Sequence, residues 1–221
     1  MFFRISGAGS PSVRGRMTTM RVRRVGVRAL LLELPDAEEV AAWRGELWRR
    51  REAGEITAVD IVPGAATILL DGVGNGTLEA IRGWPPPDPG ATVAHAPLVE
   101  IPTEFDGDDL ADVAELWDVE VPTAVERLVA ASLRVAFCGF APGFAYLSGL
   151  PEEWAVPRLA APRPRVPAGA VALAGGYAGI YPSASPGGWR LVGRTSVTLF
   201  DVRRRPPALL PPGTRVRLVQ A

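Results

Sequence analysis

The sequence predicts an α+β protein in which a small N-terminal α+β unit is followed by a β-barrel or β-sandwich. Of its 221 residues 22 are proline and 24 glycine, and only Pro11, Pro35 and Pro63 precede residue 85. Because proline is excluded from helix interiors and central strands, regular helices should concentrate in the first half. From residue 133 onward, short apolar runs recur between proline and glycine turns, which is typical of a barrel or sandwich.

The first half alternates between strand and helix patterns. Residues 25–34 form a β-rich run that ends at Pro35. Asp36 is placed to cap a helix that continues to about Arg51, with acidic residues in the first turn, arginines in the last and an apolar face between them. The other elements predicted here are strands at residues 56–62 and 66–70, around a Pro63-Gly64 turn, and a short helix at residues 77–82.

A proline-rich stretch, residues 84–90, marks the boundary between the two units, because it favours an extended conformation. We therefore predict four segments: a disordered tail (1–19), an N-terminal α+β domain (20–84), a linker (85–91) and a β-barrel domain (92–221).

The second half should begin with a strand and two short helices. The second helix carries a predicted capping box, Thr123 with Glu126, directly after Pro122. The strands predicted in this half lie at residues 92–104, 134–140, 171–174, 189–192, 197–201 and 215–219.

The side-chain inventory excludes several chemistries. The chain has no lysine, so all 24 basic residues are arginine, and it has one histidine and one cysteine. A P-loop, a Schiff base, an internal disulfide and a Cys/His zinc site therefore cannot be built, and no metal-ligand cluster is evident. Zero net charge argues against a nucleic-acid or anionic-membrane partner. No apolar run approaches the roughly 18 residues of a membrane span, and no signal-peptide core is present, so a cytoplasmic protein is expected.

The segment from Phe137 to Thr195 is the densest in motifs. Its tight turns project aromatic rings and arginines, and Pro186-Gly187 suits a type II turn. The rings that could line an apolar pocket with polar tips are Phe140, Phe144, Tyr146, Tyr177, Tyr181 and Trp189. The alternative is that the turns are barrel corners and the rings are core.

Three arginines, Arg158, Arg163 and Arg165, lie in a proline-locked stretch. In an extended chain Arg163 and Arg165 share a face, which suits a bidentate grip on a carboxylate or carboxyphosphate. The alternative is a solvated charged loop.

Other polar residues carry weaker signals. Asp106, Asp108 and Asp109 could bind a cation, or could simply precede a helix N-terminus. His95 has no nearby carboxylate in sequence and is expected to be structural or exposed. Cys138 is expected to be an inert core thiol.

These motifs closely resemble those of the KipI/PxpB family, also known as allophanate hydrolase subunit 1 or the C and D subdomains of a carboxyltransferase domain. The matching runs are G-F-A-P-G-F-A-Y-L, P-R, V-P-A-G, G-I-Y-P, S-P-G-G-W and G-R-T, in order, between Phe137 and Thr195. The resemblance extends more weakly from about Met20 to the C-terminus. It implies that the second domain is a cyclophilin-like β-barrel.

The resemblance also implies a role. Family members are the B component of an ATP-dependent 5-oxoprolinase, which opens the small cyclic amide 5-oxoproline to glutamate. They work with two partners, a KipA-like C component and an A component. ATP is expected at the partner or shared with it, and the chain is expected to be inactive alone. The alternatives are a KipI-like inhibitor of a histidine kinase, a subunit of an allophanate hydrolase or urea carboxylase system, and a catalytically relaxed scaffold.

Carried onto this sequence, the motifs assign catalytic roles to Arg163, Tyr181, Ser185 and Arg194. The substrate-binding residues they imply are Phe140, Pro142, Gly143, Phe144, Tyr146, Arg158, Gly187, Gly188 and Trp189.

The sequence departs from the family pattern at four places, where a hydroxyl or imidazole is absent but the turn residues remain. Either catalysis has relaxed while assembly persists, or these groups never took part in the chemistry. The departures are Leu128-Val129-Ala130 in place of a His-Thr pair, Ala170, Ala178 and Phe105.

Overall fold

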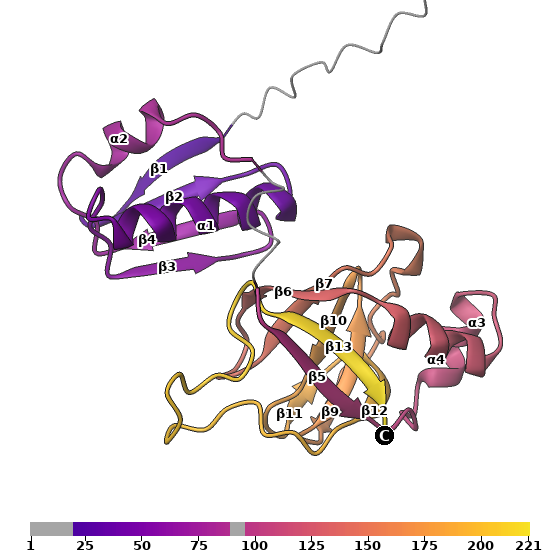
Figure 1. Ribbon diagram of the computed structural model, residues 1–221. Coiled ribbons are helices and arrows are strands. Elements are labelled where there is room, and N and C mark those ends of the chain that lie inside the picture. Colours follow the sequence, from indigo (N-terminus) through magenta and orange to yellow (C-terminus); the bar gives the residue numbers. More distant parts are fainter. Residues whose placement is uncertain (1–19, 89–95) are drawn as a thin grey trace, which may run out of the picture.

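The structure, a computed structural model, describes residues 20–88 and 96–221 (Figure 1). The described residues contain two main β-sheets with separate buried cores, and a two-stranded ribbon. We call residues 20–88 the N-terminal unit and residues 96–221 the barrel unit. The predicted α+β class with a barrel-like second sheet is confirmed. The predicted tail, the end of the predicted linker and His95 lie outside the described residues.

The N-terminal unit holds a four-stranded antiparallel sheet in the order β1-β2-β4-β3. The strand predicted at residues 25–34 is confirmed for residues 29–33, which form β2. Its first residues instead belong to the end of β1 and to the turn of a β1–β2 hairpin, where Gly26 adopts φ 65°. The strands are β1 (Arg21–Val25), β2 (Ala29–Glu33), β3 (Asp60–Pro63) and β4 (Thr67–Asp71).

Helix α1 (Ala37–Glu52) packs on this sheet as its pattern predicts. The Asp36 carboxylate accepts a hydrogen bond from the Glu39 backbone N–H at 3.0 Å, which confirms the N-cap. Trp43 and Leu47 are fully buried against the strands. A second helix, α2 (Thr77–Gly83), contributes to the same core.

The barrel unit is built on a seven-stranded sheet in the order β12-β9-β10-β7-β6-β13-β5. Among the described strands, only β13 and β5 pair in parallel. The two edges meet, since the Glu104 and Arg194 backbones exchange hydrogen bonds of 2.9 and 2.8 Å, so the sheet is nearly closed. The strands are β5 (Leu98–Thr103), β6 (Leu133–Cys138), β7 (Ala145–Ser148), β9 (Ala170–Ala174), β10 (Tyr177–Ile180), β12 (Arg190–Arg194) and β13 (Arg215–Gln220), with a separate ribbon of β8 (Arg163–Val166) and β11 (Ser185–Gly187).

Helices α3 (Leu110–Leu116) and α4 (Val121–Ala130) pack against the barrel, and a short 3₁₀ turn, η1 (Glu152–Trp154), follows β7. The predicted capping box is wrong. Helix α4 already starts at Val121, with Glu120 as N-cap, because Pro122 fits the first helical turn. Thr123 therefore lies inside the helix.

A predicted strand at residues 197–201 is also absent; Phe200 makes only an isolated bridge with Ala208. In the part of the chain that the structure describes, no helix is both long and apolar enough to traverse a bilayer.

Candidate functional site

The motif-rich segment folds into a small aromatic pocket in the barrel unit, with a volume of about 80 Å³. It draws residues from the loop after β6, from β7, and from the region around β11. Its lining, which we call the aromatic pocket, consists of Phe140, Phe144, Tyr146, Arg158, Tyr181, Pro186, Gly187, Gly188 and Trp189. Eight of these nine residues are among the predicted site residues, and Pro186 is the addition.

Phe144 is the centre of the aromatic frame. Its ring is buried and makes edge contacts with Tyr181, Trp189 and Tyr146 at centroid distances of 5.2, 5.5 and 5.1 Å. Such edge-to-face packing holds each ring in one orientation. Phe144 therefore belongs both to the core and to the pocket wall.

Phe140 differs from the other rings because it stands at the open rim. It is 62% exposed and has a φ of 66°, a left-handed conformation that bulky residues rarely adopt. Its ring still contacts Phe144, with centroids 5.3 Å apart. The tight turn from Gly139 thus presents an aromatic ring to solvent at the pocket mouth.

The Tyr181 hydroxyl is a polar group of the aromatic pocket on a buried side chain. Burial raises the pKa of this hydroxyl, while the Trp189 backbone N–H and the charges of Arg158 and Arg163 oppose the rise. The hydroxyl therefore stays protonated at neutral pH and can donate a hydrogen bond. The Arg158 guanidinium lies 5.9 Å from the Trp189 ring centroid, a cation–π contact that keeps its charge beside the pocket.

Gly187 allows the chain to approach this hydroxyl closely. A Cβ atom at Gly187 would overlap the Tyr181 hydroxyl, whereas one at Gly188 would meet its nearest neighbour, the Leu159 carbonyl, at 3.7 Å. The predicted type II turn at Pro186-Gly187 is wrong, because both residues belong to strand β11, paired with β8.

Arg163 lies behind the pocket and does not line it. Its Nη2 donates to the Asp109 carboxylate at 2.8 Å, and the other oxygen of that carboxylate accepts from the Leu191 N–H at 2.7 Å. Asp109 is buried at the N-terminus of α3, and these two hydrogen bonds join the β8–β11 ribbon to strand β12 of the barrel sheet. Arg163 Nη1 and Ser185 Oγ are buried without a hydrogen-bond partner.

The role of Asp109 is not predicted by the sequence, which indicates only a cation ligand or part of a helix N-terminus. Asp109 and Arg163 are 54 positions apart, and no local pattern pairs them. Asp109 does lie at a helix N-terminus, as the second of these alternatives states, but that position does not indicate its contacts with Arg163 and Leu191. Among the described residues, no group of three or more His, Cys, Asp or Glu side chains is placed to hold a metal ion.

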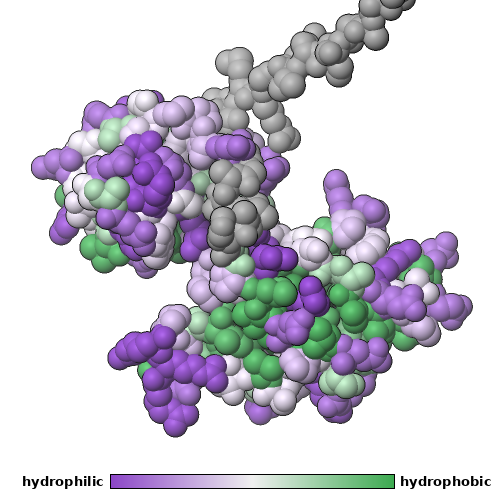
Figure 2. Space-filling view, viewed as in Figure 1, coloured by the Kyte–Doolittle hydropathy of each residue, from purple (hydrophilic) through white to green (hydrophobic). Residues whose placement is uncertain are grey.

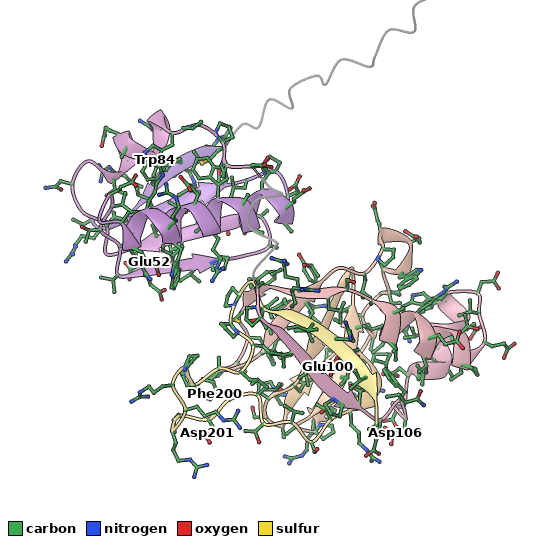
Figure 3. The ribbon with its side chains drawn as sticks, viewed as in Figure 1. Glu52, Trp84, Glu100, Asp106, Phe200 and Asp201 are labelled. Carbon is green, nitrogen blue, oxygen red and sulfur yellow. The ribbon has the colours of Figure 1, made fainter. Side chains whose placement is uncertain are left out.

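Three predicted residues lie elsewhere. Arg194 forms ion pairs with Glu104 and Asp106 at the barrel's closing edge, where Asp106 is labelled in Figure 3. Pro142 and Gly143 belong to the turn before β7 but do not line the pocket. Gly143 has φ 84° and packs against the Phe200 side chain, so it shapes the turn.

The structure also bears on the predictions for Cys138 and for the Arg163 and Arg165 pair. Cys138 is partly buried, its Sγ lies 3.5 Å from the Leu210 carbonyl oxygen, and burial raises its pKa, as expected of an inert thiol. The predicted joint grip of Arg163 and Arg165 on a carboxylate is wrong, because Arg163 is engaged with Asp109 while Arg165 is exposed.

None of the positions at which the chain departs from the family pattern lines the aromatic pocket. Leu128, Ala170 and Ala178 are buried in apolar clusters, and Phe105 packs against one of them. The absent hydroxyls and imidazole therefore remove nothing from the pocket itself.

Comparison with known proteins shows which family the chain belongs to. The family model for the carboxyltransferase domain, subdomains C and D, matches residues 20–210. The chain belongs to this family. The B subunit of 5-oxoprolinase from Escherichia coli O157:H7 is 37% identical over 214 residues, which cover 92% of this chain and 97% of the relative. The predicted membership of the KipI/PxpB family is thus confirmed.

Solved structures with similar folds support this family membership. TTHA0988 is 34% identical with a TM-score of 0.70; the match covers 88% of this chain but only 40% of that chain. The conserved uncharacterized protein PH0987 from Pyrococcus horikoshii is 30% identical with a TM-score of 0.54, covering 91% of this chain and 97% of that one. The urea amidolyase of K. lactis, 19% identical with a TM-score of 0.64, shares the fold.

Proposed function

We propose that this chain is the B component of a heteromeric, ATP-dependent 5-oxoprolinase, acting with a KipA-like C component and an A component. The observation that carries the proposal is the match to the E. coli relative, which spans nearly all of both chains. The name of that relative supports a multi-subunit enzyme, and TTHA0988 extends well beyond the part that this chain matches.

The aromatic pocket suits a small polar ring. Rigid aromatic walls bind the apolar face of such a ring, and the protonated Tyr181 hydroxyl donates to an oxygen on it. The Arg158 guanidinium supplies a counter-charge for a carboxylate. A five-membered cyclic amide bearing a carboxylate presents all three features.

ATP does not fit the aromatic pocket. Its volume of about 80 Å³ is far below the roughly 300 Å³ at which drug-sized ligand sites begin. The chain also has no lysine for a phosphate. We therefore place ATP outside this pocket, on the partner components or shared with them, and assign to the aromatic pocket the holding and orienting of the amide.

The barrel surface also supports assembly. Figure 2 shows apolar area on the barrel unit near β5 and β13, where Leu98 is 41% exposed. A groove there is lined by Leu98, Val129 and Val216 together with Arg215 and Arg217. Apolar patches of this kind mark protein–protein contacts.

The test is co-expression with the A and C components, co-purification, and an assay of glutamate release from 5-oxoproline with and without ATP. An assembled complex that hydrolyses ATP but releases no glutamate would reject the proposal. The variant Arg158→Ala should lower the rate by about tenfold or more, whereas Arg165→Ala, an exposed arginine outside the pocket, should not. Full activity in the Arg158 variant would favour a scaffold role.

A further inference from the structure

A second and larger cavity lies between helix α1 and the barrel unit, with a volume of about 730 Å³. This is within the usual range for small-molecule sites. It shares no residue with the aromatic pocket. We call it the α1 cavity; its lining is Ala37, Ala41, Arg44, Trp48, Glu52, Ala96, Pro97, Arg134, Val135, Ala136, Ser148, Pro211, Pro212, Gly213 and Thr214.

The side chain in this cavity that indicates a bound ligand is Arg44. Its Nε is buried without a hydrogen-bond partner, and its Nη1 lies 3.1 Å from where a Cβ of Gly213 would be, so it faces the barrel unit. Burial lowers the pKa of this guanidinium. Leaving a desolvated charge unpaired costs free energy, which a bound anion would offset.

The charged form of Arg44 has no carboxylate partner among the described residues, and residues 1–19 and 89–95 contain no Asp or Glu. The ionisable group that acts on it is the Cys138 thiol, and burial raises the pKa of that thiol, which favours its neutral form. The acid in the lining, Glu52, comes from the end of α1, is labelled in Figure 3, and accepts a hydrogen bond from Trp48 Nε1 at 3.0 Å. What holds Arg44 is the Trp48 ring, whose centroid lies 5.4 Å from its Cζ.

The rest of the lining indicates the kind of anion. Its charged side chains are Arg44, Arg134 and Glu52, and of these it is Arg44 that has a buried nitrogen without a hydrogen-bond partner. The hydroxyls of Ser148 and Thr214 donate to carbonyl oxygens. Most other lining residues are alanine, valine and proline, which suits a monoanion on an apolar body better than a phosphate, whose several oxygens need many donors.

We propose that the α1 cavity binds a small-molecule carboxylate, with the carboxylate on Arg44 and an apolar body against Trp48 and the proline-rich loop before β13. Because the lining comes from both units, the ligand would bridge them. This site is separate from the one proposed for the cyclic amide, and it does not require the chain to be part of a 5-oxoprolinase.

The test is calorimetric titration of the full chain with benzoate as the probe. Saturable one-to-one binding is expected, and Arg44→Gln should weaken it by about tenfold or more. The matched control is Arg51→Gln: Arg51 stacks on the same Trp48 ring, with its Cζ 4.0 Å from the centroid, but does not line the cavity. This variant should retain the wild-type affinity.

Parallel titrations with inorganic phosphate and sodium chloride separate the carboxylate from anions in general. Phosphate binding as tight as benzoate would overturn the assignment, and so would equal benzoate binding by wild type and Arg44→Gln, or no benzoate binding at all. Urea unfolding of Arg44→Gln reports its folding. Its midpoint should equal or exceed that of the wild type, since no ion pair is lost.

Discussion

Replacing Asp109 by asparagine should destabilise the barrel unit, because its buried carboxylate joins the β8–β11 ribbon to strand β12 of the barrel sheet. The substitution preserves shape, and the asparagine carbonyl can still accept from the Leu191 N–H. The ion pair to Arg163, with a distance of 2.8 Å and side-chain exposures of 25% and 7%, is lost.

The size of the effect follows from that partial exposure. Breaking a fully buried ion pair costs about 3–5 kcal/mol. Since a quarter of the Arg163 side chain remains in water, we expect a loss of about 2 kcal/mol in the free energy of unfolding. At a urea slope of about 2 kcal/mol per molar, the midpoint should fall by roughly 1 M.

The matched control is Asp112→Asn. Asp112 lies on the same helix and pairs with Arg190 at 2.9 Å, but its side chain is 59% exposed, so the loss should not exceed about 0.5 kcal/mol. Urea unfolding of both variants, followed by tryptophan fluorescence, measures the difference. Equal midpoint shifts for the two variants would refute the idea that Asp109 anchors the site.

Two further predictions concern the pocket and the N-terminal unit. Gly187→Ala should push its new methyl group into Tyr181 and cost about 1–3 kcal/mol, whereas Gly188→Ala, with its nearest atom at 3.7 Å, should cost no more than about 0.5 kcal/mol. Urea midpoints compare them, and a harmless Gly187→Ala would contradict the pocket geometry. Arg49 and Arg50 lower the pKa of Glu46 from 4.5 to about 2. The stabilisation from Glu46 is therefore present above pH 4.5 and is lost as the pH falls toward 2. In the Glu46→Gln variant, the free energy of unfolding should fall less steeply over this pH range than in the wild type. The same slope in both proteins would argue against the ion pairs.

The aromatic pocket was largely predictable because its lining comes from one motif-rich segment. The family motifs between residues 137 and 195 indicate Phe140, Phe144 and Trp189 as site residues, although several strands separate Trp189 from the two phenylalanines. Helix α1 was predictable for a different reason, since its cap and its apolar face are properties of adjacent residues.

The predictions were wrong where contacts between segments distant in sequence determine the position of a residue. Arg194 was grouped with the site by its motif, but barrel closure places it beside Glu104, 90 positions away. Pro186-Gly187 has a turn composition, yet pairing with β8 makes it a strand. The Asp109–Arg163 pair and the α1 cavity depend on elements far apart in sequence, so no local sequence pattern predicts them.

We propose that this chain is the B component that a 5-oxoprolinase needs for turnover. The most direct measurement is the initial rate of ATP-dependent glutamate formation from 5-oxoproline by the A and C components, with and without this chain. We predict turnover only when this chain is present. The same rate without it, or no turnover from a fully assembled complex that hydrolyses ATP, would contradict the claim.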